Sequence, residues 1–147
     1  IFTIGGTKNG ALFGEAIVFN DKELGNQFNY YMKQHGALLS KGFLLGAQFE
    51  ALFEDVLYER IGKAAFDSAQ KFIKGLEGTK VKYAATPESN LIFLHMDNEI
   101  FEKLSEEVQF DIMLPGEQES IVRFVTNYRT TDEEVENAIA ALKKYYW

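Results

Sequence analysis

The sequence predicts an α/β protein in which a strand-rich start is followed by helices and then by a small α+β unit. Two runs rich in β-branched and aromatic residues flank a glycine-rich turn within Ile1–Phe19. Apolar residues then recur at helical spacing from about residue 22 to residue 76, and the period becomes strand-like beyond Gly78. We therefore expect three parts, residues 1–20, 21–78 and 79–147.

Composition narrows the class of protein before any motif is considered. The 147 residues are 46% hydrophobic, enough to bury a core of about one domain. The net charge of -7 argues against nucleic acid as a partner. With no cysteine and two separated histidines, we expect neither a disulfide nor a metal site. No apolar run reaches the roughly 20 residues needed to cross a bilayer, so we expect no membrane partner and a cytoplasmic location.

Three helices are expected in the middle part. Asn20-Asp21 offers a cap for a first helix over about residues 22–34. A second helix has a broad apolar face that we expect to be buried, formed by Leu45, Phe49, Leu52 and Val56. A third helix runs from about Tyr58 to Leu76 and ends in glycines with lysines nearby.

The last part reads as a small antiparallel or mixed sheet with helices on one face. Residues 80–84 predict a peripheral strand, and residues 90–96 a central strand buried on both faces. Asp97-Asn98 caps a short helix, after which residues 108–114 alternate as a strand with one covered face. Pro115-Gly116 leads into residues 121–126, which complete an antiparallel hairpin. Thr131 and Glu134 form a capping box at the start of the final helix.

One lysine stands at the centre of the first glycine-rich turn, Gly5-Gly6-Thr7-Lys8-Asn9-Gly10. Glycine tolerates the positive φ angles of such a loop, so the turn can project Lys8 from a rigid frame above the sheet edge. Turn chemistry alone also fits a simple strand connection with a solvated lysine.

A wider pattern bears on this choice. Residues 3–19 resemble the cofactor-lysine segment of the threonine aldolases and related β-eliminating lyases, and residues 31–42 and 121–127 continue the likeness in the family's own order. The resemblance implies pyridoxal phosphate and the aspartate-aminotransferase-like fold (fold type I), of which this chain matches the C-terminal half. It also implies that 1–20 is a remnant of the large domain carrying the lysine loop, and that 21–78 is a helical connection. Because the chain opens directly in strand-like sequence, we expect Ile1 to be a cut inside a larger protein.

The resemblance assigns roles to three residues. Lys8 would be the Schiff-base lysine, and Arg123 the ligand of the substrate carboxylate. The residues alone allow this for Arg123, since a guanidinium beside Ile121 and Val125 needs a partner, although an edge arginine reaching water is the alternative. Lys41 would contact the cofactor phosphate, yet related chains often carry an arginine two positions later, where this chain has Phe43.

Other polar residues are expected to be structural. We interpret His35 as a helix C-cap or surface residue and His95 as a satisfied core histidine. Glu106-Glu107 and Glu133-Glu134 are expected on solvated helix faces. The general base and the ligands of the cofactor phosphate and pyridine nitrogen are expected in the missing first half.

The resemblance to the threonine aldolases therefore implies a fragment of a pyridoxal-phosphate-dependent carbon–carbon lyase acting on β-hydroxy-α-amino acids. Low specificity L-threonine aldolase, which splits threonine into glycine and acetaldehyde, is the model for the intact enzyme. We expect a homo-oligomer, dimer or tetramer, in the intact enzyme and no activity in the isolated fragment. The alternative is a non-catalytic α+β association module in which Lys8 is incidental.

Overall fold

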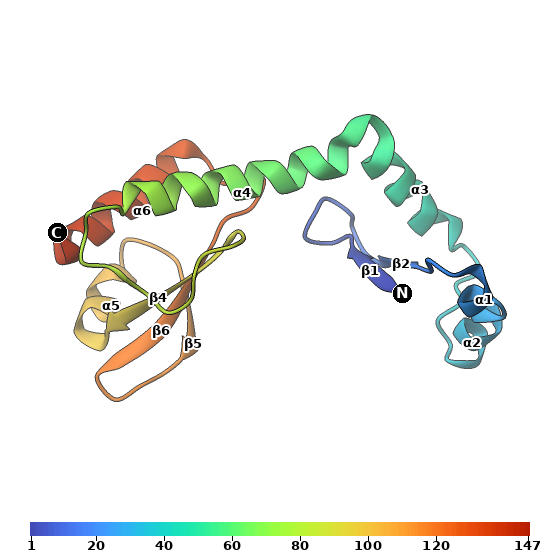
Figure 1. Cartoon of the computed structure of the whole chain (residues 1–147), viewed down its shortest axis with the longest axis horizontal. Coiled ribbons are helices and arrows are strands. Elements are labelled where there is room, and N and C mark those ends of the chain that lie inside the picture. The colour runs from blue at the N-terminus through green and yellow to red at the C-terminus, as the bar shows by residue number, and fades with distance from the viewer. The chain divides into compact units, whose positions relative to one another are not determined.

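The computed structural model describes all residues 1–147, which form two units, Ile1–Ile61 and Gly62–Trp147 (Figure 1). In the first unit β1 (Phe2–Gly5) and β2 (Glu15–Val18) pair as antiparallel strands, with Phe2 opposite Val18 and Gly5 opposite Glu15. The predicted strand, lysine loop and strand are therefore confirmed.

The helix expected over residues 22–34 is two helices, α1 (Lys22–Gly25) and α2 (Phe28–Gln34). Asp21 caps α1 as predicted, accepting a hydrogen bond from the Glu23 amide at 2.9 Å. The prediction of one helix is wrong because Gln27 takes a left-handed conformation, with φ of 65°, which interrupts the helical ladder. The ring of Phe28 then packs edge-on against Phe19, with centroids 5.0 Å apart, and so fixes the start of α2.

The second predicted helix is α3 (Phe43–Phe53), and it is followed by a single 3-10 turn, η1 (Glu54–Val56). Asp55 and Val56 have φ angles of 50° and 54°, so Val56 lies beyond the helix rather than on its apolar face. Only Leu52 of α3 is buried. Leu45 and Phe49 are half-buried, so within this chain the broad apolar face is covered only in part.

The third predicted helix is confirmed as α4 (Leu57–Gly75), whose first residues belong to the first unit and whose remainder belongs to the second. No helix of the structure combines the length and the apolar character needed to cross a membrane.

The second unit is built on a four-stranded antiparallel sheet in the order β3-β4-β6-β5. Its strands are β3 (Lys82–Tyr83), β4 (Leu91–Asp97), β5 (Asp111–Leu114) and β6 (Glu119–Val125). The helix α5 (Asn98–Leu104) follows β4, and α6 (Asp132–Tyr146) ends the chain. The mixed helix and strand content agrees with the predicted fold class, and the hairpin of β5 and β6 is confirmed.

The core of this unit lies between one face of the sheet and the helices α4 and α6, which run side by side (Figure 1). Lys71 of α4 bridges to Glu136 of α6 at 2.8 Å. Buried apolar residues fill the space between sheet and helices: Ala69, Phe72, Leu76, Ile92, Leu94, Met96, Leu104, Val122, Phe124, Val135, Ala138, Ala141 and Leu142. Because the helices cover only this face, the opposite face of the sheet is left half-exposed.

The capping box of α6 is present as predicted. The Glu134 amide donates to the Thr131 hydroxyl at 3.2 Å, and the Glu134 carboxylate accepts from the Thr131 amide at 2.7 Å. The Glu134 carboxylate also accepts from the Thr131 hydroxyl at 3.0 Å. The two hydrogen bonds that this carboxylate accepts, first of all the one from the Thr131 amide, lower the pKa of Glu134.

Three expectations for the sheet are wrong in part. The central strand β4 is fully buried on one face only, because Leu91, Phe93 and His95 alternate with the core residues. His95 is therefore not a core histidine; it pairs with Glu119 on β6 at 2.8 Å. The strand expected over 108–114 begins only at Asp111, and its four residues are exposed because β5 is an edge strand that pairs with β6 alone.

Candidate active site

The loop between β1 and β2 holds Lys8 in a tight turn. The carbonyl of Gly6 accepts hydrogen bonds from the amides of Asn9, at 2.9 Å, and of Ala11, at 3.0 Å. Gly10 and Gly14 have φ angles of 105° and 97°, a region that L-residues rarely adopt. The glycines of the sequence pattern are thus required by the shape of this loop.

Side chains from the helices of the same unit fix the loop from outside. Asn9 donates its side-chain amide to the carbonyl of Tyr58 at 2.8 Å, and the Tyr58 hydroxyl donates to the carbonyl of Gly5 at 2.8 Å. On the other side the Leu12 amide donates to the side chain of Gln48 at 2.8 Å. One arm of the loop is therefore tied to the first turn of α4 and the other to α3. Sequence reasoning missed these contacts, because nothing in Gln48 or Tyr58 marks them as partners of a loop 36 to 53 residues earlier.

The side chain of Lys8 is free within this frame. Lys8 is exposed and takes part in none of the hydrogen bonds or ion pairs that hold the loop. Its backbone is fixed by its neighbours, because Gly6 is buried and lies close to the ring of Phe49. A Cβ placed on Gly6 would be only 3.1 Å from that ring. The arrangement is a primary amine on a rigid support, which suits covalent attachment to an aldehyde.

Arg123 lies in the second unit, in the middle of β6, on the sheet face that no helix covers. It stands opposite Phe93 on β4 and opposite Asp111 on β5. Its Nη2 donates to the Asp111 carboxylate at 2.7 Å, while its Nε is buried without a hydrogen-bond partner. The sequence predicted that this guanidinium needs a partner, but it did not identify Asp111.

Comparison with known proteins supports the family resemblance. No family model matches the chain. Over 107 residues it is 35% identical to the low specificity L-threonine aldolase of Pseudomonas sp. (strain NCIMB 10558) and 31% identical to that of Pseudomonas aeruginosa. Each alignment covers 71% of this chain and 30% of the relative. The structure of Leishmania major threonine aldolase matches with a TM-score of 0.90 and 32% identity, over 97% of this chain and 42% of that one.

This chain belongs to the threonine aldolase family. It spans about 30% of the length of the curated threonine aldolases that it matches. Because the structural match covers 97% of the chain, it includes both units, and with them the mixed α/β fold.

Lys41 is the third residue that the threonine aldolase resemblance singled out. It lies in the turn that precedes α3, in the same unit as Lys8, and is exposed. Phe43, which stands where related chains often carry an arginine, is also exposed, with 69% of its surface accessible. No hydrogen bond or ion pair joins Lys41 to the Lys8 loop.

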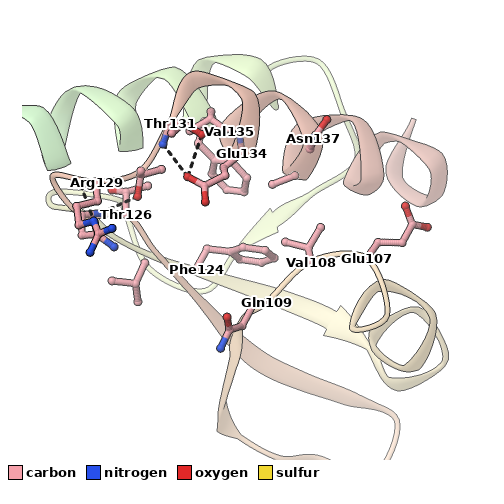
Figure 2. A pocket seen from close by; sticks show the side chains of 15 residues that line it. Glu107, Val108, Gln109, Phe124, Thr126, Arg129, Thr131, Glu134, Val135 and Asn137 are labelled. Carbon is pink, nitrogen blue, oxygen red and sulfur yellow. Dashed lines mark hydrogen bonds between the residues drawn. The ribbon is translucent and has the colours of Figure 1, made fainter.

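A separate cavity of about 780 Å³ lies in the second unit, between the start of α6 and the sheet (Figure 2). Residues of α6 line one side of it, and Phe124, Val108 and Gln109 line the other. Its carboxylates are already engaged, Glu134 in the capping box and Glu107 with Lys144. Phe124 faces the core while its neighbour Arg123 points to the opposite face, so this cavity is distinct from the Arg123 site.

Proposed function

We propose that this chain is the C-terminal part of a pyridoxal-phosphate-dependent lyase that cleaves β-hydroxy-α-amino acids, with threonine as the model substrate. The observation that carries the proposal is the free amine of Lys8 on a loop that helix side chains fix on both sides. The relatives that carry this likeness are described as threonine aldolases. The activity for which these relatives are named is the reason for choosing this substrate class over other amino acids.

The residues of the chain fit one end of the cofactor. Pyridoxal phosphate needs a lysine amine that can reach its aldehyde carbon, and Lys8 is exposed and bound to no other group of the loop. Lys41 is the second cation in this unit that we assign to the cofactor, on its phosphate. We infer that the remaining contacts, to the phosphate and the pyridine nitrogen, come from residues outside this sequence.

Each residue of the proposed site has one task. When bound, the cofactor supplies an electron sink for the charge that develops as the Cα–Cβ bond breaks. The Lys8 Nζ holds the cofactor and gives it up to the amino group of the substrate. The Arg123 guanidinium binds the substrate carboxylate, for which its planar fork is suited. The base that takes the proton from the β-hydroxyl is not assigned to any residue of this chain.

The test is the absorption spectrum of the protein after addition of pyridoxal phosphate. A cofactor bound to lysine absorbs in the visible, and we expect this band to be lost in Lys8→Ala. The matched control is Lys33→Ala, which removes an exposed lysine from α2 in the same unit. A band of equal size in Lys8→Ala and the unmodified protein would refute the proposal.

One observation favours the rival function, a non-catalytic association module. Several large apolar side chains of the first unit are exposed, including Leu12 at 88%, Tyr30 at 71% and Phe43 at 69%. Such surface commonly marks association sites. We propose that it is covered in a homo-oligomer, which both functions allow, and sedimentation at micromolar concentration tests this. Association without any lysine-dependent band would favour the rival.

A further inference from the structure

Asp111 and Arg123 form a cross-strand pair that the proposed catalytic roles do not use. They stand directly opposite each other on β5 and β6, and one hydrogen bond of 2.7 Å joins the Asp111 carboxylate to the Arg123 Nη2. Opposite residues on neighbouring antiparallel strands lie on the same face of the sheet. For this pair it is the face that α4 and α6 leave uncovered.

The two partners differ in how free they are. The Arg123 side chain is 31% exposed and its Nε is buried, whereas the Asp111 side chain is 57% exposed at the sheet edge. A long arginine side chain on a half-exposed face can otherwise turn its head toward water. The carboxylate of Asp111 gives this guanidinium one fixed neighbour. Its position is fixed because the backbones of β5 and β6 are paired at these two residues.

The guanidinium is not fully used by this contact. Arginine carries five N–H donors, and Asp111 engages Nη2 through a single bond while Nε has no partner. A buried donor without an acceptor is unfavourable. The buried Nε is out of reach of an incoming ligand, but the side chain is partly exposed, so the remaining Nη donors have capacity for a second acceptor such as a carboxylate.

We propose that Asp111 is a positioning residue that holds Arg123 by one nitrogen so that its remaining donors receive the α-carboxylate of the substrate. The inference rests on the proposed function of Arg123. It adds that substrate binding depends on a residue of the edge strand β5 that does not itself touch the substrate. The register of the β5–β6 hairpin, and not the residue type of Arg123 alone, sets this orientation.

Five variants of the full-length enzyme, among them Arg123→Ala alone, test the proposal through KM and kcat for threonine. Asp111→Ala removes the acceptor and the charge, and we expect KM to rise about threefold to tenfold with kcat changed by less than about twofold. Asp111→Asn keeps one acceptor oxygen, so its KM should be close to that of the unmodified enzyme. Glu119→Gln is the matched control, because it alters another cross-strand pair of β6, that with His95, and should leave KM unchanged.

The fourth variant combines Asp111→Ala with Arg123→Ala. If Asp111 acts through Arg123, the double variant should have the same KM as Arg123→Ala alone, whereas a purely structural loss would add to it. A lower KM in both Asp111 variants would show that Asp111 competes with the substrate and overturn the proposal, as would an unchanged KM. If Arg123→Ala itself keeps normal kcat/KM, the proposed role of Arg123 fails instead, so the two failures are distinct.

Discussion

Replacing Gly6 by alanine should disturb the Lys8 loop without touching Lys8. A Cβ at this position would lie 2.6 Å from the carbonyl oxygen of Gly14, 2.9 Å from the Cβ of Ala11 and 3.1 Å from the ring of Phe49. The distances to Gly14 and Ala11 are shorter than van der Waals contact allows for a Cβ. The Gly14 oxygen belongs to the backbone, so it cannot move away as a flexible side chain could. The loop must therefore shift where its two arms meet.

The size of the effect follows from the cost of overpacking. Inserting a methyl group into a well-packed site typically destabilises a protein by about 1–3 kcal/mol. For a chain of this length each kcal/mol lowers Tm by roughly 2–4 °C, so we expect a decrease of about 2–12 °C. The neighbouring glycine offers a matched control, because a Cβ at Gly5 would meet nothing within 4 Å. Gly5→Ala should leave Tm within about 2 °C of the unmodified protein.

Thermal unfolding and hydrogen exchange together check this prediction. The amides of Asn9 and Ala11 both donate to the Gly6 carbonyl, so their exchange should accelerate in Gly6→Ala and stay protected in Gly5→Ala. The visible band of bound pyridoxal phosphate should weaken in Gly6→Ala, although Lys8 is intact. Equal Tm, exchange and cofactor binding in the two variants would refute the argument that the close approach at Gly6 fixes the lysine.

Two further predictions concern the second unit. In the full-length enzyme, Arg123→Ala should lower kcat/KM for threonine by about thirty-fold to several thousand-fold, and Arg123→Lys should fall between alanine and the unmodified enzyme. The visible band of the cofactor bound to Lys8 should survive both changes. A near-normal kcat/KM of Arg123→Ala in steady-state kinetics would contradict this prediction. Because the pKa of Glu134 is lowered in the folded state, its stabilisation of α6 is present above its unfolded pKa near 4.5 and lost as pH falls through the lower folded value. Thr131→Ala should destabilise by about 1 kcal/mol at neutral pH. In urea titrations it should weaken this acid dependence without abolishing it, because the hydrogen bond from the residue 131 amide to the Glu134 carboxylate remains, whereas Thr131→Ser should retain it in full.

The sequence predicted the elements whose signals are local. The glycines around Lys8 indicated the loop, and the Thr131–Glu134 spacing indicated the start of α6, because both depend on residues a few positions apart. The break between α1 and α2 has no comparable signal. Gln27 adopts a left-handed conformation that its residue type disfavours, and the contact of Phe28 with Phe19 belongs to tertiary packing.

Burial was harder to predict than element type. The nearly continuous apolar run of β4 predicts a strand buried on both faces, since His95 and Phe93 sit among apolar residues, yet the helices cover one face only. In α3 the apolar spacing is real, but of the predicted face only Leu52 is fully buried, while Leu45 and Phe49 are half-buried. A hydrophobic pattern indicates which side chains favour burial, but it does not indicate which helix or sheet packs against them.

The Arg123 site shows where sequence reasoning reaches its limit on chemistry. An arginine between Ile121 and Val125 signals a guanidinium on a half-apolar face, and that signal is local. Its partner cannot be read in the same way, because Asp111 comes opposite Arg123 only through the register of the β5–β6 hairpin. That register shifts between Ile112 and Leu114, so counting back from the turn at Pro115-Gly116 would place a different residue opposite the arginine. The irregularity in the edge strand thus decides which side chain holds the proposed substrate ligand.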